Sequence, residues 1–597
     1  MRKIALLLSF FLLLTVLAEA SVPVFPLNEI KAGMVGKGKT VFAGGTIEEF
    51  DVEILGVLHN FQPRRNLILA KLKNSILERA GIMEGMSGSP VYIDGKLAGA
   101  VAYSFPFSKE PIAGITPIEE MLSIPKTQDS RSSLSPQVPI KKHLTLDDFF
   151  EINRELFPSR MGIFSDEQTI SPINIPLLFT GFSSQAFNKT KSFFSRLGFS
   201  PVRIGAVSQQ SGEISIPDTG LREGDPVGVQ LIGGDVDMSA VGTVTHVDGK
   251  KILAFGHPLY NLGTVDYAMT RARVLTVIPS LSNSFKIAAT DKVVGSFSQD
   301  RVSGMYGELG KKPKSIPVNI RLLTAKGEKR EFTVNVADDK ILSWALVNVS
   351  VLSVMSVEER AVGDLTLDFS GDIYLENGMS IHLEDLFSGS YDNSVTDLSS
   401  LVAAVVFFLT NNEFQDLTIH RIDLDISASE ELKFSNMEQV WLDKYDASAG
   451  EPIQIKIYTR NFRGESSLQE VTIAAPDLPS GSEFYLVIGD AVSIRQIEMS
   501  QYKTRDFLPR SLSQLIRLLG QLRKNNRIYF KIIAAKPGLF LKGEEMPNLP
   551  PTMKSMFSSS RAASSTPTEL NRSTLREYQL PIPYVFKGVA VVPIKIK

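Results

Sequence analysis

Ser87 is the side chain with the clearest chemical use in this chain, because glycines flank it within the stretch Gly85 to Pro90. A strand-like run follows, and Asp94-Gly95 then turns the chain into a second one. Asp-Gly between two apolar runs predicts a β-hairpin, so Ser87 lies on a tight loop that enters the hairpin. Glycine lets the backbone approach a ligand closely, and such a loop can aim successive amide N–H groups at one point, as an oxyanion hole requires. The alternative, a turn of small residues without chemistry, remains open on these residues alone.

A serine hydroxyl is a poor nucleophile until a base removes its proton, and that base is most often a histidine. His59 is near Ser87 in the sequence and is the main rival for this role, whereas His246 falls within an expected strand and equally suits packing. His257 follows an expected strand and lies in the stretch Ala254 to Leu259. The chain has six histidines in all: His59, His143, His246, His257, His382 and His420.

Three segments carry a family resemblance. Gly85 to Val101, with its Gly-Met-Ser-Gly-Ser-Pro start, resembles the serine segment of the stage IV sporulation protein B family of serine peptidases, and is similar to the Gly-Asp-Ser-Gly-Gly-Pro loop of chymotrypsin-like enzymes. Gly242 to His257 resembles the histidine segment of the same family, and Lys292 to Phe297 also looks familial. The resemblance implies a nucleophile, a general base and an oxyanion hole, carried by Ser87, by His257 and by the amides of Gly85 and Ser87. A structural role for His257 remains the alternative.

The chain departs from the family pattern in two ways. The family places its histidine segment before its serine segment, whereas Ser87 here precedes His257. Triad geometry does not depend on chain order, so the site requires the two units to dock face to face. The family's aspartate in the approach to the serine is missing, since Lys71 to Glu84 contains no Asp, and Asp266 is the substitute that we predict. Loss of the acid alone costs about four orders of magnitude in turnover, so a weak or inactive protein stays possible.

Composition narrows the choice of function. The 597 residues are 43% hydrophobic and 21% charged, which is ordinary for a globular protein of roughly three or four domains. A net charge of −2 gives no electrostatic reason to expect a nucleic-acid partner. The absence of cysteine excludes disulfides and thiolate metal sites. Because zinc, phosphate-loop and dinucleotide motifs are also missing, we expect no cofactor and no metal.

The N-terminus predicts export. A basic start, an apolar run from Ile4 to Leu17 and the small residues around Glu19 are typical of a secretory signal peptide that is cleaved after Ala20. The other long apolar run, Leu401 to Leu409, is too short to cross a bilayer. We therefore expect a periplasmic or secreted protein with no stable membrane span after cleavage.

The fold class that we expect is mainly β, because short strand-like runs alternate with turns through most of the chain. Chymotrypsin-like β-barrel peptidase units would be followed by an α+β region and an immunoglobulin-like β-sandwich. The expected divisions are a signal peptide (1–20), a serine-bearing β-barrel unit (21–125), a linker (126–142), a β-rich histidine-bearing unit (143–345), an α+β region (346–430), a β-sandwich-like domain with a helix (431–547), and a Ser/Thr-rich linker with C-terminal strands (548–597).

These expectations lead to one function and one alternative. The first is an exported serine endopeptidase that cuts envelope or secreted proteins by acyl transfer from Ser87 with His257 as base. The alternative is a binding or scaffold protein of the cell envelope that keeps the peptidase fold with little or no turnover. Either would have a protein or peptide partner, and the sequence indicates no oligomeric state.

Overall fold

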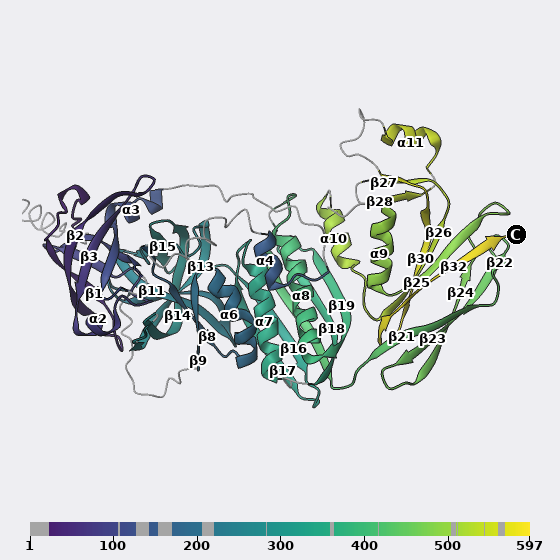
Figure 1. Cartoon of the computed structure of the whole chain (residues 1–597), viewed down its shortest axis with the longest axis horizontal. Helices are drawn as coiled ribbons and strands as arrows, with labels where there is room; N and C mark the ends of the chain where they lie inside the picture. The colour runs from purple at the N-terminus through teal and green to yellow at the C-terminus, as the bar shows by residue number, and fades with distance from the viewer. Residues whose placement is uncertain are drawn as a thin grey trace, which may run out of the picture.

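The computed structural model describes residues 23–105, 108–126, 142–152, 170–205, 220–281, 283–358, 363–415, 417–502, 509, 511–541, 544–547, 549–558 and 568–597. The expected signal peptide and nearly all of the expected linker lie outside these residues. The chain is elongated, with its N-terminal and C-terminal sheets at opposite ends (Figure 1). The mainly β class is confirmed.

The first sheet closes into a six-stranded barrel. Its strands are β1 (Val35–Thr40), β2 (Glu48–Gln62), β3 (Arg65–Lys73), β4 (Pro90–Ile93), β5 (Lys96–Ser104) and β6 (Ile112–Pro117). They pair in the order β1-β2-β3-β6-β5-β4, and β4 pairs back to β1. Two short helices, α2 (Ser75–Ala80) and α3 (Ile118–Leu122), flank the barrel. Apolar residues that alternate along β2, such as Phe50, Val52 and Ile54, fill its core.

A second six-stranded ring repeats this order. It contains β10 (Pro226–Gly234), β11 (Asp237–Asp248), β12 (Lys251–Ala254), β13 (Gly263–Ile278), β14 (Phe285–Arg301) and β15 (Gly304–Leu309). The pairing runs β10-β11-β12-β15-β14-β13 and returns to β10. Numbered within each ring, both therefore read 1-2-3-6-5-4. We call them barrel 1 and barrel 2.

The sheet of barrel 2 continues on both sides. On one side β11 pairs with β8 (Ile175–Thr180), which is followed by α6 (Ser184–Arg196) and by the parallel strand β9 (Phe199–Ile204). On the other side β10 leads to β17 (Lys329–Ala337), β16 (Ser315–Leu323), β20 (Ile419–Ser429), β18 (Asp364–Leu375) and β19 (Ser380–Ser390). One continuous sheet thus crosses the expected division at residue 345.

Two apolar helices lie against this extended sheet. α7 (Ser343–Glu358) and α8 (Tyr391–Thr410) pack on each other and share the large buried core around Trp344. Among the described helices, α8 is the one long and apolar enough to cross a membrane, but most of it is buried inside the protein. Burial of that kind is what a core helix of a folded domain shows.

The C-terminal part contains two sheets around one apolar core. The first consists of β24 (Ser466–Ala474), β23 (Pro452–Asn461), β21 (Phe434–Leu442) and β31 (Val585–Lys587), and the second of β22 (Asp446–Ala447), β32 (Val589–Ile596), β25 (Glu483–Gly489), β26 (Arg527–Ala534) and β30 (Ser573–Pro581). Smaller elements are α9 (Ala491–Tyr502), α10 (Leu512–Gly520), α11 (Pro551–Ser558), β27 (Gly538–Leu541), β28 (Glu544–Pro547) and β29 (Thr568–Leu570). Strands β31 and β32 pair in parallel with β21 and β22, whereas immunoglobulin sheets are antiparallel. The immunoglobulin-like identity stays a prediction.

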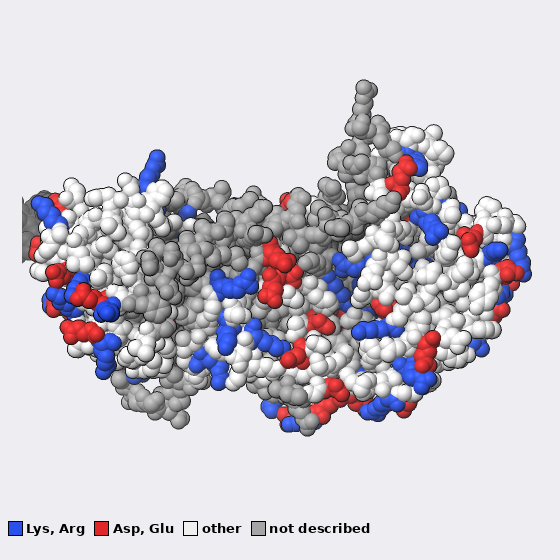
Figure 2. Space-filling model, viewed as in Figure 1, with Lys and Arg blue, Asp and Glu red and all other residues white. Residues whose placement is uncertain are grey.

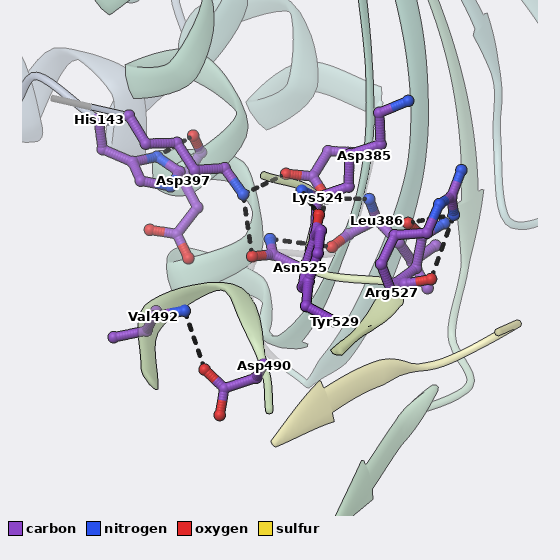
Figure 3. A network of polar contacts seen from close by, with 12 residues as sticks. His143, Asp385, Leu386, Asp397, Asp490, Val492, Lys524, Asn525, Arg527 and Tyr529 are labelled. Carbon is purple, nitrogen blue, oxygen red and sulfur yellow. Dashed lines mark hydrogen bonds and ion pairs between the residues drawn. The ribbon is translucent and has the colours of Figure 1, made fainter. Parts of the chain in front are cut away.

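A polar network joins the C-terminal part to the middle of the chain (Figure 3). Lys142 lies 2.6 Å from the Asp385 carboxylate on β19 and donates to the side chain of Asn525 at 3.0 Å. The Asn525 amide in turn donates to Asp385 at 2.7 Å. Residues that precede the second unit thus help to fix the orientation of the C-terminal sheets.

The surface charge is mixed. On the face drawn in Figure 2, Lys and Arg side chains are interspersed with Asp and Glu. This distribution agrees with the net charge of −2.

Candidate active site

The structure brings Ser87 and His257 together, although 170 residues separate them. The Ser87 hydroxyl lies 2.9 Å from His257 Nε2. The other ring nitrogen, Nδ1, lies 3.0 Å from the carbonyl oxygen of Pro258. A carbonyl only accepts hydrogen bonds, so Nδ1 carries the ring proton and Nε2 accepts from the serine hydroxyl. This tautomer is the one that a general base needs.

Glycines shape the loop that carries the serine. Gly85 and Gly88 have φ values of 91° and 96°, which side chains strongly disfavour. The Gly88 amide donates to the carbonyl of Val101 on β5 at 2.8 Å, and the Ser89 amide donates to Met86 at 2.9 Å. The loop is therefore tied to the hairpin that the Asp94-Gly95 turn predicted.

The amides of Gly85 and Ser87 have no partner among the described residues. Both residues are buried, and unpaired buried amides are rare in folded proteins. Two such amides beside a nucleophile are what an oxyanion hole presents to a substrate carbonyl. The arrangement supports the predicted oxyanion hole, which stays a prediction.

A strained turn presents the histidine. Phe255 is fully buried and has a φ of 69°, and Gly256 follows with 68°. A bulky residue in this region costs about 1–3 kcal/mol, which surrounding contacts must offset. The Thr116 hydroxyl of barrel 1 donates to the Gly256 carbonyl at 2.6 Å and helps to hold the turn.

Asp300 lies beneath the loop that follows the histidine. This carboxylate at the end of β14 is fully buried and accepts the amides of Leu259 at 2.7 Å and Tyr260 at 2.6 Å. A buried carboxylate that accepts several amides fixes the backbone bearing them. Asp266, in contrast, accepts from the Ser296 hydroxyl at 2.5 Å. The sequence analysis missed Asp300, whose only signal was its position just after the familial stretch of β14.

The two barrels hold each other's loops. The Thr243 amide donates to the Ser87 carbonyl at 2.8 Å, and the Thr243 hydroxyl donates to the Gly85 carbonyl at 3.0 Å. The Thr245 hydroxyl donates to the Gly88 carbonyl at 2.7 Å. A Cβ on Gly88 would lie only 2.0 Å from the Thr243 carbonyl oxygen, so the contact leaves room for glycine alone.

A buried lysine and a buried carboxyl flank the serine loop. Lys286 on β14 donates to the Thr40 hydroxyl at 2.7 Å, and loss of solvent lowers the pKa of its amine to about 7. Glu84, three residues before the serine, accepts from the Ser200 hydroxyl at 2.7 Å. Burial raises the pKa of Glu84 to about 7, against the opposing effect of its hydrogen bonds. Burial thus favours the neutral forms of both side chains, the amine of Lys286 and the carboxylic acid of Glu84.

The remaining histidines have other surroundings. His246 pairs with Glu223 at 2.7 Å, and Glu223 also accepts from the Tyr92 hydroxyl of barrel 1. His143 lies 3.0 Å from the Asp397 carbonyl near the junction in Figure 3, and burial lowers its pKa to about 4. The other three are exposed on strands: His59, His382 and His420.

Comparison with known proteins supports a serine peptidase. Residues 13–122 match the model of a family described as SpoIVB peptidase S55. The match spans all six strands of barrel 1 and includes Ser87, so this barrel is SpoIVB-like, as the sequence predicted. It ends before barrel 2 and His257. Neither the curated proteins nor the solved structures contain a significant match.

Proposed function

We propose that this protein is an exported serine endopeptidase that acts on envelope or secreted proteins with Ser87 as nucleophile and His257 as general base. The observation that carries the proposal is the 2.9 Å contact between the serine hydroxyl and His257 Nε2. It joins two segments that resemble one peptidase family but lie in different barrels.

The reaction follows from the geometry. Ser87 Oγ attacks the substrate carbonyl carbon while His257 Nε2 takes the hydroxyl proton. The amides of Gly85 and Ser87 donate hydrogen bonds to the developing oxyanion. His257 then gives its proton to the departing amine, and water releases the acyl group by the same steps in reverse order. Asp300 acts as a positioning residue, because it holds the loop next to the histidine.

One observation favours the alternative of an inert scaffold. Ser87 is only 1% exposed and His257 only 2%, so a substrate cannot reach them without movement. A scaffold would keep this arrangement permanently, whereas a peptidase must open it.

Labelling with a fluorophosphonate separates the two functions. The probe bonds to an activated serine oxygen with loss of fluoride, and the proton passes to the base. We expect one labelled site at Ser87, abolished in Ser87→Ala and lowered by about 10³-fold or more in His257→Ala. Matched controls are Ser108→Ala, an exposed serine of barrel 1, and His59→Ala, an exposed histidine on β2. If the unaltered chain is not labelled under any condition, the peptidase proposal is wrong and the inert scaffold is the function that remains.

A further inference from the structure

A short piece of the chain lies along the strand that adjoins the serine loop. Ser171–Pro172 form strand β7, which pairs antiparallel with β5 in the register Ser104 to Ser171 and Tyr103 to Pro172. The Ile173 amide then donates to the Ala102 carbonyl at 2.9 Å.

The position of this piece is set by its neighbours on the same strand. β4 pairs with β5 from Lys96 to Ala100. The next residue, Val101, accepts the Gly88 amide at 2.8 Å. The segment 171–173 therefore pairs with the part of β5 that directly follows Val101. Its bond to Ala102 is one residue beyond the bond from Gly88 to Val101.

Two isoleucines anchor the segment. Ile173 is 3% exposed and belongs to the same buried cluster as Met83 and Met86, the apolar residues before Ser87. Ile170 is 9% exposed and belongs to a separate cluster with Leu67 and Tyr103. Backbone pairing to a strand edge with side chains in separate pockets is how proteins recognise extended peptides.

We propose that residues 170–173 occupy the peptide-binding groove of this protein. Substrates are then extended segments that pair antiparallel with residues 102–104 of β5 and place a branched aliphatic side chain where Ile173 lies. They bind only after the internal segment has been displaced. This inference rests on the proposed function.

The segment forms a shorter strand than those around it. β7 has two residues, whereas β5 has nine. A cavity of about 130 Å³ borders it and is lined by Glu84, Ser104 and Asn174 among others. Because the segment is part of the same chain, it competes with a substrate peptide at an effective concentration in the millimolar range for short links. The segment must therefore leave the groove before a substrate binds.

A reversible cross-link tests the proposal. The chain has no cysteine, and Ser104 and Ser171 are opposite each other, so the double variant Ser104→Cys/Ser171→Cys introduces one pair at a distance that suits a disulfide. The probe is a diphenyl phosphonate whose peptide copies residues 170–173. Ser87 Oγ bonds to phosphorus, phenoxide leaves, and His257 takes the proton. We expect the labelling rate to fall about tenfold or more on oxidation and to recover on reduction.

The matched control places the same chemistry in the distant C-terminal sheet. Thr459 and Ser467 are opposite each other on β23 and β24, and we expect Thr459→Cys/Ser467→Cys to label equally in both redox states. If Ser104→Cys/Ser171→Cys is labelled at the same rate when oxidised and when reduced, the inference is wrong and the proposed function is unaffected. Failure of every variant and of the unaltered chain to label would remove both.

Hydrogen exchange gives a readout that needs no activity. We expect the Ile173 amide to exchange roughly 100-fold faster than that of Val101, which lies on β5 and donates to Ser89 at 2.9 Å. Equal protection of the two amides would show that the segment is a permanent part of the barrel, and the inference would fail.

Discussion

Barrels 1 and 2 have the same strand order, yet each contributes a different reactive group. Ser87 lies between the third and fourth strands of barrel 1, and His257 lies between the third and fourth strands of barrel 2. Each residue adjoins a glycine in a left-handed conformation, Gly88 or Gly256. The same connection in two similar barrels therefore faces one shared interface from opposite sides. This symmetry explains how the serine can come first in the chain without loss of the site.

The barrels differ in what surrounds them. Barrel 1 closes on itself, with β7 on part of one edge of β5 as its only added strand among the described residues. Barrel 2 is part of a 13-stranded sheet that runs into the middle of the protein. The histidine is thus held by the larger body, whereas the serine belongs to a small unit that could move against it. Motion of barrel 1 or of the segment on β5 is the simplest way to expose the site.

The largest effect that we expect concerns the carboxylate of barrel 2. Asp300→Asn removes the charge that orders the loop after His257, and we expect the labelling rate at Ser87 to fall about 10³-fold. The pH dependence of labelling should shift too, because the histidine loses its fixed surroundings. Asp266→Asn is the matched control, since Asp266 contacts Ser296. A loss in Asp266→Asn alone, with unchanged labelling of Asp300→Asn, would return the role to Asp266.

The next effect concerns the contact between the barrels. Gly88→Ala forces a Cβ to within 2.5 Å of the Phe255 amide and strains the backbone, so we expect a loss of about 3 kcal/mol in the free energy of unfolding. Gly256→Ala is the counterpart in barrel 2, where the nearest atoms are the Cβ atoms of Ala100 and Ala102 at 3.1 Å. Urea unfolding should show a smaller loss there. A larger loss in the free energy of unfolding for Gly256→Ala would mean that the histidine turn, rather than the serine loop, limits how closely the two barrels pack.

The serine side also has a titrating group in its approach. The pKa of Glu84 is raised from 4.5 to about 7, so the folded state holds this proton more tightly than the unfolded state. Its contribution to stability is complete below pH 4.5 and is lost as the pH rises through 7, by about 3 kcal/mol. Glu84→Gln should flatten that part of the stability curve in urea unfolding. An unchanged slope would assign the pH dependence to other groups.

The smallest effects test the reciprocal threonine contacts. Thr116→Val removes a hydrogen bond that barrel 1 gives to the histidine turn, and Thr245→Val removes one that barrel 2 gives to the serine loop. We expect each to cost about 1 kcal/mol in unfolding experiments. Similar decreases of the labelling rate in the two variants would indicate that the inter-barrel hydrogen bonds stabilise the serine loop and the histidine turn to a similar extent. A loss in only one would show which loop depends on its partner barrel.

Short-range patterns predicted much of the local structure. The turn at Asp94-Gly95 formed as expected, because glycine conformation acts within a few residues. β1 ends at Thr40, because its pairing with β2 and β4 decides where it stops. Pairing between distant strands is not visible in a single sequence.

The sequence by itself determined the chemistry available: a serine between glycines, a histidine after a glycine, and the absence of cysteine. These are local properties of residue type and spacing. Only the tertiary structure decided that Ser87 and His257 meet, that Asp300 rather than Asp266 holds the histidine loop, and that residues 171–173 lie along β5. The physical reason is that each of these contacts joins segments from different strands, and the closing of the barrels alone brings them within hydrogen-bonding distance.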